Sequence, residues 1–297
     1  MKKLLIYVEI QTKITSLLTF SLVMLVLNYH NVDINVLNTA VFFAGMFLFD
    51  LTTTTINNYI DSKTNHEDFG FPRSTLKIIM LTLLALSILF GLWLVVLTDW
   101  VVLLLGMFSF FVGIIYTFGP IAISRQPYGE IVSGIFYGYV MTFILVYINL
   151  QSAFLSVTLG SSISIILNSK LMIGFLILGF IPTLLTSAIM LGNNTCDVEK
   201  DVLVNRFTLP FYIGKENAVK LLISLYALVF VGAIVGVLTG VYPVYALVLL
   251  LLAPKVLKNA KDLGIEYSKE RSFPFVIQNF IMVMAVLILV MIIANII

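Results

Sequence analysis

The sequence has little charge for its length. Only 11% of its 297 residues are Asp, Glu, Lys or Arg, whereas 60% are hydrophobic and the mean hydropathy is +1.08. A soluble domain of this size needs far more charged surface, so the composition predicts a protein with several membrane spans. A single cysteine, Cys196, excludes an internal disulfide framework and fits a site that faces the cytoplasm. The net charge of +2 is too small to indicate a nucleic-acid partner.

Nine apolar runs are candidates for membrane-spanning helices, each of which needs about 20 apolar residues. The eighth run is the shortest, because Pro243 opens it and Pro254 lies near its end. The short connections at Thr98-Asp99 and Gly240 predict antiparallel helical hairpins. The runs cover residues 14–30, 35–57, 75–97, 99–119, 128–150, 171–193, 217–240, 242–257 and 274–296.

The positions of Lys and Arg predict the orientation in the membrane. If the N-terminus is inside, every basic residue except Lys170 falls in an inside segment. A wrong number of helices would scramble this alternation. The sequence therefore predicts an all-α, multi-pass bundle of nine helices in the cell membrane, with the N-terminus inside and the C-terminus outside. It is expected to form one domain over residues 1–297.

Two inside segments concentrate polar side chains. The first covers residues 57–68 and the second covers residues 193–201, and both open with Asn-Asn followed by an Asp four residues after the first Asn. Asn193, Asp197 and Asp201 have i, i+4, i+8 spacing, so a continuous helix would align them over about 12 Å of one face. In the first segment Asn57, Asp61 and Asn65 repeat that spacing.

Clustered carboxylates repel each other unless a cation joins them, and hard oxygen ligands suit Mg²⁺. Two facing stripes could hold Mg²⁺ ions, and the ions could hold a diphosphate. The sequence contains no GxxxxGK[ST] phosphate loop, so metal bridging is the visible way to neutralise phosphate. The candidate metal ligands are Asn57, Asn58, Asp61, Asn65, Glu67, Asp68, Asn193, Asn194, Asp197 and Asp201, and the basic candidates for the diphosphate are Lys63, Arg73, Lys200 and Arg206.

At these residues the sequence resembles the UbiA superfamily of membrane prenyltransferases. That family carries two Asp-rich motifs at the cytoplasmic ends of helices 2 and 6 of nine. The flanking segments are most similar to the branch that prenylates 1,4-dihydroxy-2-naphthoate on the way to demethylmenaquinone. They are residues 9–13, residues 116–120 with Gly129-Glu130, Gly134 and Gly138, and residues 206–210 with Gly214.

The first motif departs from the family pattern. Asn58 stands where the family usually has Asp, and Asn65 occupies a later acidic position. An amide oxygen can still bind Mg²⁺ but adds no negative charge, and either Glu67 or Asp68 could supply the missing carboxylate. The second motif keeps its acids, Asp197 and Asp201.

The resemblance implies Mg²⁺-dependent transfer of a polyprenyl chain from its diphosphate to an aromatic acceptor. Asn57, Asp61, Asp197 and Asp201 would be the catalytic residues. A prenyl cation needs a dry cavity lined by aromatic faces. The candidates for that lining are Tyr59, Tyr116, Tyr137 and Tyr139.

Asp50 is a separate candidate, because an ionisable group in a membrane span is usually functional. It lies about 16 Å from Asp61 along a helix, too far to share a metal. It either faces the cavity near the acceptor or bonds to a neighbouring helix. The residues from Thr52 to Thr55 are expected to bond back to their own helix, with no catalytic role.

Several alternatives stay open at this stage. The acceptor could be another aromatic molecule such as 4-hydroxybenzoate or haem. A secondary transporter also places acids inside a helical bundle, but usually at the midplane. Each polar segment alone could be an ordinary solvated loop, and the matched spacing in both argues for function.

Overall fold

A computed structural model describes residues 2–64, 68–119, 122–159 and 163–297, except for the side chains of residues 61, 63, 64 and 159. The chain divides into two compact units, which are considered one at a time. Unit 1 comprises Met1–Leu17 and Ile34–Ile123, and unit 2 comprises Leu18–Asp33 and Ser124–Ile297. In the described residues, eight helices are long and apolar enough to cross a membrane. The prediction of a mostly helical chain with several candidate membrane spans is therefore confirmed.

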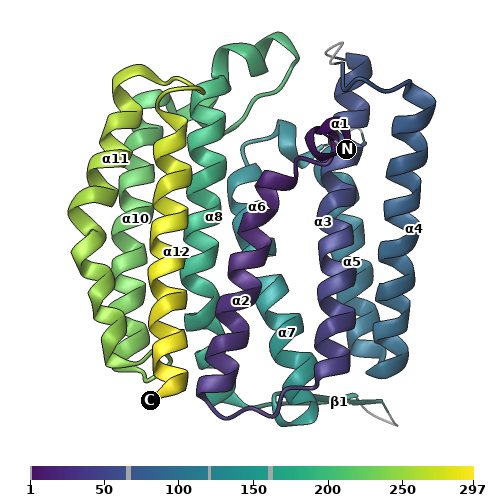
Figure 1. Ribbon diagram of the computed structural model, residues 1–297, viewed down its shortest axis with the longest axis vertical. Helices are drawn as coiled ribbons and strands as arrows, with labels where there is room; N and C mark the ends of the chain where they lie inside the picture. The colour runs from purple at the N-terminus through teal and green to yellow at the C-terminus, as the bar shows by residue number, and fades with distance from the viewer. Residues whose placement is uncertain (1, 65–67, 120–121, 160–162) are drawn as a thin grey trace. The chain divides into compact units, whose positions relative to one another are not determined.

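Unit 1 is built from three long helices and the N-terminal segment. Figure 1 labels these elements, and α4 and α5 both pack against α3. The Asn35 side chain caps α3 by accepting from the Asn38 N–H at 2.9 Å, and Asp99 caps α5 through the Val101 N–H at 2.9 Å. Asp99 thus makes the predicted tight turn between α4 and α5. The elements are α1 (Lys2–Tyr7), η1 (Ile10–Lys13), the start of α2 (Ile14–Tyr29), α3 (Val36–Thr64), α4 (Arg73–Leu97) and α5 (Trp100–Thr117).

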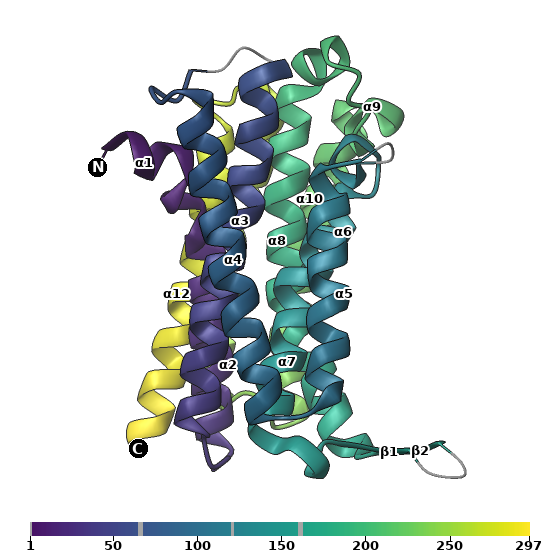
Figure 2. The same ribbon diagram turned by 90° about the vertical axis from the view of Figure 1, so that its right-hand side faces the viewer.

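Unit 2 is organised around α8 (Ser169–Leu203), a helix of 35 residues that packs against α6, α10 and α12. The short helix α9 joins α8 to α10 (Figure 2). The other elements are the rest of α2, η2 (Ile123–Arg125, of which Ser124 and Arg125 belong to unit 2), α6 (Gly129–Ile135), the π-helical turn η3 (Phe136–Val140), α7 (Met141–Leu150), η4 (Gln151–Ala153), α9 (Leu209–Ile213), α10 (Lys215–Leu238), η5 (Val244–Leu252), α11 (Ala253–Glu266) and α12 (Phe273–Ile296).

Pro182 lies inside α8 without ending it. Proline has no N–H, so the carbonyl of Leu178 loses its usual partner within the helix. The buried Tyr242 hydroxyl donates to that carbonyl at 3.4 Å. A side chain from the turn after α10 therefore restores the missing bond.

Gly134 and Gly138 let α6 and η3 lie directly against α8. A Cβ on Gly134 would lie 2.7 Å from the Thr183 carbonyl oxygen, and one on Gly138 would lie 2.6 Å from Thr183 Cα. Real Cβ atoms do not approach other atoms so closely, so any side chain would push the helices apart. Both glycines face Thr183 of α8, which lies before the second polar segment of that helix.

The eighth predicted run has a different form from the others. Residues 242–257 are divided between η5 and α11, and neither helix alone counts among the eight candidate spans. Pro243 caps η5, and Pro254 lies in the first turn of α11. Proline is tolerated at helix starts, so the two prolines set the boundaries of these helices.

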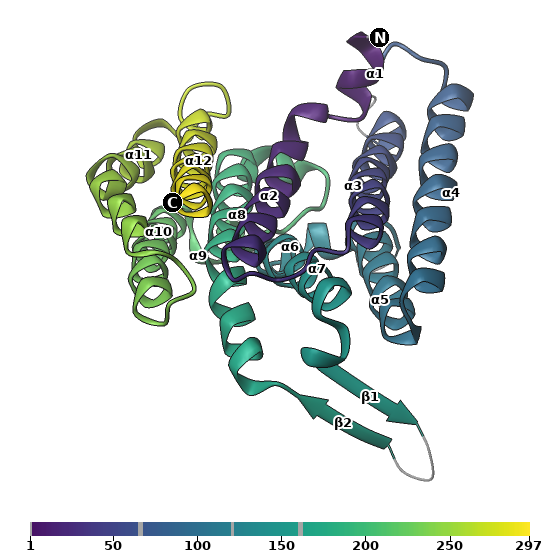
Figure 3. The same ribbon diagram turned by 60° about the horizontal axis from the view of Figure 1, so that its bottom comes forward.

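A β-hairpin corrects the expectation that the fold is all-α. β1 (Leu155–Leu159) pairs antiparallel with β2 (Ile163–Leu167), with Leu155 opposite Leu167 and Val157 opposite Ile165. Figure 3 shows the hairpin extending from the ends of α7 and α8. One face carries Leu155, Val157, Ile165 and Leu167, and Ile165 is 66% exposed. Apolar residues alternate with Ser and Thr through most of the hairpin, the period expected of a half-buried strand.

Candidate active site

The first polar segment lies at the end of α3. This helix runs through Asn57 and Asp61 and ends at Thr64. Asn57 is partly buried. Two predicted metal ligands, Asn65 and Glu67, lie outside the described residues, as do the side chains of Asp61 and Lys63.

Asn58 holds the N-terminal segment against α3. Its side-chain amide, 3% exposed, donates to the Tyr7 carbonyl at 2.9 Å and to Glu9 Oε1 at 3.1 Å. A metal role for Asn58 would therefore have to use its Oδ1. The Tyr7 hydroxyl lies 3.1 Å from the carbonyl oxygens of both Thr55 and Leu76. Burial, reinforced by nearby Tyr59, raises the pKa of this hydroxyl, which therefore stays protonated as a donor.

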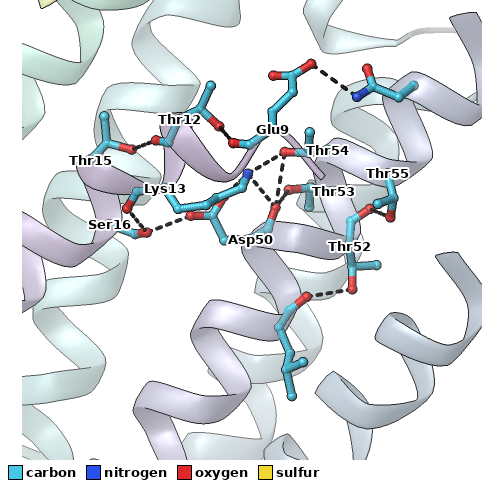
Figure 4. Close-up of polar contacts among 12 residues, drawn as sticks. Glu9, Thr12, Lys13, Thr15, Ser16, Asp50, Thr52, Thr53, Thr54 and Thr55 are labelled. Carbon is cyan, nitrogen blue, oxygen red and sulfur yellow. Dashed lines mark hydrogen bonds and ion pairs between the residues drawn. The ribbon is translucent and has the colours of Figure 1, made fainter. Parts of the chain in front are cut away.

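Asp50 is part of a buried ion pair with Lys13 (Figure 4). Lys13 Nζ donates to Asp50 Oδ1 and to the Asp50 carbonyl oxygen, both at 2.9 Å, and also to Thr54 Oγ1. Ser16 Oγ donates to Asp50 Oδ2 at 2.6 Å. The structure shows Asp50 bonded to a neighbouring segment, where Lys13 supplies a positive charge that the sequence did not predict for it.

The threonines near Asp50 bond to their own helix, as predicted. Thr52 donates to the Leu48 carbonyl at 2.7 Å, Thr53 to the Asp50 carbonyl at 3.0 Å and Thr55 to the Thr52 carbonyl at 2.9 Å (Figure 4). Thr54 lies 3.2 Å from the Asp50 carbonyl and also receives the bond from Lys13. The bond that Thr54 receives from Lys13 joins the N-terminal segment to the helix that carries the first motif.

Two predicted ligand-binding residues of unit 1 are neighbours. The Arg73 guanidinium lies over the Tyr59 ring, 4.4 Å from its centroid, in a cation–π contact. Tyr116 is half-buried near the end of α5. The Asp68 carboxylate accepts from the Gly70 N–H at 2.7 Å and is exposed.

The second polar segment is helical throughout. Because α8 runs to Leu203, Asn193, Asp197 and Asp201 satisfy the condition for a stripe on one helix face. Asn193 and Asp197 are partly buried, and Asp201 is 6% exposed. The local helix thus places three oxygen-bearing side chains in register.

The ammonium of Lys269 sits between two of these side chains. Lys269 Nζ donates to both Asn193 Oδ1 and Asp197 Oδ2. It therefore supplies a positive charge to the Asp197 carboxylate. Since one amide and one carboxylate oxygen already converge on a single positive atom, Asn193 and Asp197 are suited to hold a metal ion.

Glu130 extends this network into α6. The Asn194 amide donates to Glu130 Oε1 at 2.8 Å, and Asn193 Nδ2 lies 3.5 Å from Asn194 Oδ1. Glu130 is 5% exposed, and among the described residues its Oε2 has no hydrogen-bond partner. Asn194 thus links a buried carboxylate to the residues that contact Lys269.

Asp201 and Arg206 lie together at the end of α8. Arg206 Nη1 lies 3.6 Å from Asp201 Oδ1, and Arg206 Nε donates to the Ser124 carbonyl at 2.9 Å. Lys200 is exposed on the same helix. Arg206 therefore joins the last acid of the motif to the segment before α6.

Tyr139, one of the aromatic candidates of unit 2, belongs to a packed aromatic layer. Tyr139 meets Phe175 edge-on, with ring centroids 5.7 Å apart, and Phe143 contacts Phe154 and Phe175 in the same way. Tyr137 is half-buried in η3. For Tyr139 the structure shows a packing role.

Within the described ranges, no three His, Cys, Asp or Glu side chains form a metal-binding group. Of the described carboxylates, Asp197 is the one that the Lys269 ammonium contacts. The sequence reading did not single out Lys13, Glu130 or Lys269 as site residues. Lys13 could be noticed in the sequence, because it is a lone basic residue at the start of a membrane span. The pairing of Lys269 could not, because its partner Asp197 lies 72 residues away.

Comparison with known sequences gives one family and one relative. The profile described as "UbiA prenyltransferase family" matches residues 16–281. A Bacillus subtilis (strain 168) protein named 1,4-dihydroxy-2-naphthoate octaprenyltransferase is 26% identical over 250 residues. This match covers 78% of the present chain and 72% of the relative.

Solved structures share the fold at lower identity. A UbiA homologue from Aeropyrum pernix K1 without ligand has a TM-score of 0.66 and 15% identity, covering 92% of this chain and 97% of that one. A UbiA homologue from Archaeoglobus fulgidus bound to GPP and Mg²⁺ has a TM-score of 0.62 and 12% identity, covering 99% and 100%. A digeranylgeranylglyceryl phosphate synthase also has a TM-score of 0.62, with 16% identity and coverage of 99% and 98%.

Proposed function

Since the chain belongs to the UbiA prenyltransferase family, we propose that it transfers a polyprenyl chain from its diphosphate to 1,4-dihydroxy-2-naphthoate, giving demethylmenaquinone. The observation that carries the choice of acceptor is the similarity to the Bacillus subtilis naphthoate octaprenyltransferase over most of the chain. Family membership also excludes the transporter alternative. Another aromatic acceptor, 4-hydroxybenzoate or haem, is the competing hypothesis.

Mg²⁺ is the proposed cofactor, and the convergence of Asn193 and Asp197 on one positive atom supports it. When bound, it would stabilise the charge that develops on the departing diphosphate. Asn57, Asn58, Asp61, Asn194 and Asp201 are proposed to share in metal binding. Glu67 and Asp68 remain the two candidates for the missing carboxylate of the first motif.

The basic side chains are proposed to bind diphosphate oxygens directly, since ammonium and guanidinium groups form strong charge-assisted hydrogen bonds with phosphate. They are Lys63, Arg73, Lys200 and Arg206. Arg73 already stacks on Tyr59, and that pair would present a cation and an aromatic face together. Tyr59 and Tyr116 are proposed to line the path of the prenyl chain and to exclude water from the reacting carbon. Asp50 is proposed to act near the acceptor through its fixed pairing with Lys13.

We also propose nine spans in a single domain, in the cell membrane, with the site on the cytoplasmic side. Two ion pairs support the count: Lys215 with Glu199 at 2.7 Å, and Lys269 with Asp197. They place the start of α10 and residues 267–272 at the same end of α8. Because α10 runs away from that end of α8, the chain has to return to it through η5 and α11 before it reaches residues 267–272. At about 2.0 Å per residue for η5 and 1.5 Å for α11 they extend about 39 Å, enough to cross the membrane.

A prenyl transfer assay tests the proposal. Purified protein in detergent would receive 1,4-dihydroxy-2-naphthoate and a labelled polyprenyl diphosphate, with and without Mg²⁺. We expect product only with Mg²⁺, and a loss of at least about a hundredfold for Asp61→Ala and for Asp197→Ala. Glu216→Ala, which changes an exposed acid in the first turn of α10, is the control and should retain activity.

The assay also separates the alternatives. Product with 4-hydroxybenzoate or haem, and none with the naphthoate, would keep the reaction class and reject the acceptor. Full activity of both Asp variants would contradict the assignment of the two motifs.

A further inference from the structure

Lys269 occupies the position where the second motif would bind its metal. It lies between α11 and α12, and its ammonium contacts Asn193 and Asp197 from outside the motif. Its side chain is 34% exposed and that of Asp197 is 18% exposed. The pair therefore lies at a partly solvated surface, where an ammonium can exchange with a dissolved cation.

A metal ion and this ammonium cannot both bind the same oxygens. Two cations in contact with one carboxylate oxygen repel each other strongly, and Mg²⁺ carries twice the charge of the lysine. Binding of a metal to Asn193 Oδ1 and Asp197 Oδ2 therefore requires Lys269 to leave.

The backbone around Lys269 is held in place by hydrogen bonds, whereas its side chain is a long, flexible stem. The Ser268 N–H donates to Ser272 Oγ at 2.8 Å, the Ser272 N–H donates to the Ser268 carbonyl at 3.0 Å, and Ser272 is 2% exposed. The Lys269 ammonium also lies 5.1 Å from the centroid of the Phe273 ring. Rotation about the four side-chain bonds of lysine can thus move the charge by several ångströms without any change in the fold.

We infer that Lys269 is a built-in counter-ion of the second motif: a divalent metal displaces it from Asp197, and its released ammonium then binds the diphosphate. The inference rests on the proposed function, because it takes the second motif as a metal site for a diphosphate substrate. It adds a residue from the α11–α12 connection to that site. In the metal-free protein Lys269 keeps Asn193 and Asp197 together.

The test compares wild-type protein with Lys269→Met, which keeps an unbranched, flexible side chain one atom shorter and removes the charge. Binding of Mn²⁺ to purified protein in detergent, with no substrate present, would be measured by electron paramagnetic resonance of the free ion. We expect Lys269→Met to bind Mn²⁺ about tenfold more tightly, because one competing positive charge is gone. With saturating Mg²⁺, we expect its affinity for inorganic diphosphate to fall about tenfold.

Two further variants serve as controls. Arg271→Met removes a charge from the same segment, but Arg271 is exposed and pairs with Glu266 at 3.1 Å, so Mn²⁺ affinity should not change. Lys269→Arg keeps a cation and should restore an affinity close to that of the wild type.

The outcomes are distinguishable. Equal Mn²⁺ affinity in wild type and a folded Lys269→Met would overturn the exchange while leaving the metal site intact. Tighter Mn²⁺ binding with unchanged diphosphate affinity would overturn the transfer of Lys269 to the diphosphate. Failure of the wild type and all variants to bind Mn²⁺ would overturn the proposed metal site itself.

Discussion

Lys13 and Asp50 are both buried, and each is the charged partner of the other. Removing one partner leaves an uncompensated charge in an apolar surrounding, so we expect Lys13→Met or Asp50→Leu to lower the free energy of unfolding by about 3–5 kcal/mol. The double variant should lose less than either single variant, because it leaves no charge behind. Resistance to unfolding by SDS would measure these differences.

Arg271→Met breaks an exposed ion pair and is the matched control, expected to leave stability nearly unchanged. If the single variants at Lys13 and Asp50 were as stable as wild type, the buried pair would have no structural role in fixing the N-terminal segment.

Glu130 acts on the second motif through Asn194. Glu130→Ala removes the acceptor of the Asn194 amide, which is 1% exposed and would lose its 2.8 Å bond. Residues that orient metal ligands typically change metal affinity by about 10–100-fold, so we expect the Mg²⁺ concentration for half-maximal activity to rise by at least about tenfold. The rate at saturating Mg²⁺ should change little.

Glu130→Gln separates this positioning role from a general loss of packing. Its side-chain oxygen can still accept from Asn194, so its Mg²⁺ requirement should stay near that of the wild type. Equal losses in Glu130→Ala and Glu130→Gln would instead assign importance to the negative charge.

Helix packing around α8 depends on the missing side chain of Gly138. In Gly138→Ala the new methyl group would lie 2.6 Å from Thr183 Cα, so η3 and α8 have to separate. Overpacking of this kind typically costs about 1–3 kcal/mol. We expect a lower unfolding temperature in detergent and weaker activity, because α8 carries the second motif.

Gly174→Ala is the matched control within α8. No described atom outside its own helix lies within 4 Å of the Cβ it would gain, and alanine favours helix by about 1 kcal/mol over glycine. It should therefore be neutral or stabilising. Stability of Gly138→Ala equal to that of Gly174→Ala would show that the close contact between η3 and α8 is not maintained in the detergent-solubilised protein.

The elements differ in how far the sequence predicts them. Long apolar runs predicted the helices, because a span needs many consecutive apolar residues and leaves a strong signal. The strand Leu155–Leu159 is five residues of alternating Leu, Ser, Val, Thr and Leu, and so short a pattern is overlooked between two helices. η5 and α11 blur the eighth run, because it is divided between a 3-10 segment and a more polar helix.

The site was predictable where the chemistry is local. The spacing of Asn193, Asp197 and Asp201 predicted a helical stripe, and α8 runs through all three. Arg206 is a local partner, because it lies five residues after Asp201. Two other partners are distant in the sequence: Lys269 contacts Asn193 and Asp197, and Glu130 bonds Asn194 beside the stripe. Only the packing of α6 and of the α11–α12 connection against α8 brings these two there, and no spacing rule encodes that packing.

The nine-span arrangement makes a prediction for the whole molecule. Lys170 and Lys261 lie on opposite sides of the membrane if α8, α10 and the η5–α11 segment each cross it. In a Cys196→Ser background, Lys170→Cys should react with a membrane-impermeant maleimide added to intact cells, and Lys261→Cys should react only after the membrane is opened. Both lysines are exposed in the fold, so reactivity reports the side of the membrane rather than burial. If Lys170→Cys and Lys261→Cys reacted alike in intact cells, the segment between α10 and α12 would not cross. The contact of Lys269 with Asp197, which needs residues 267–272 at the motif end of α8, would then have to be abandoned along with the ninth span.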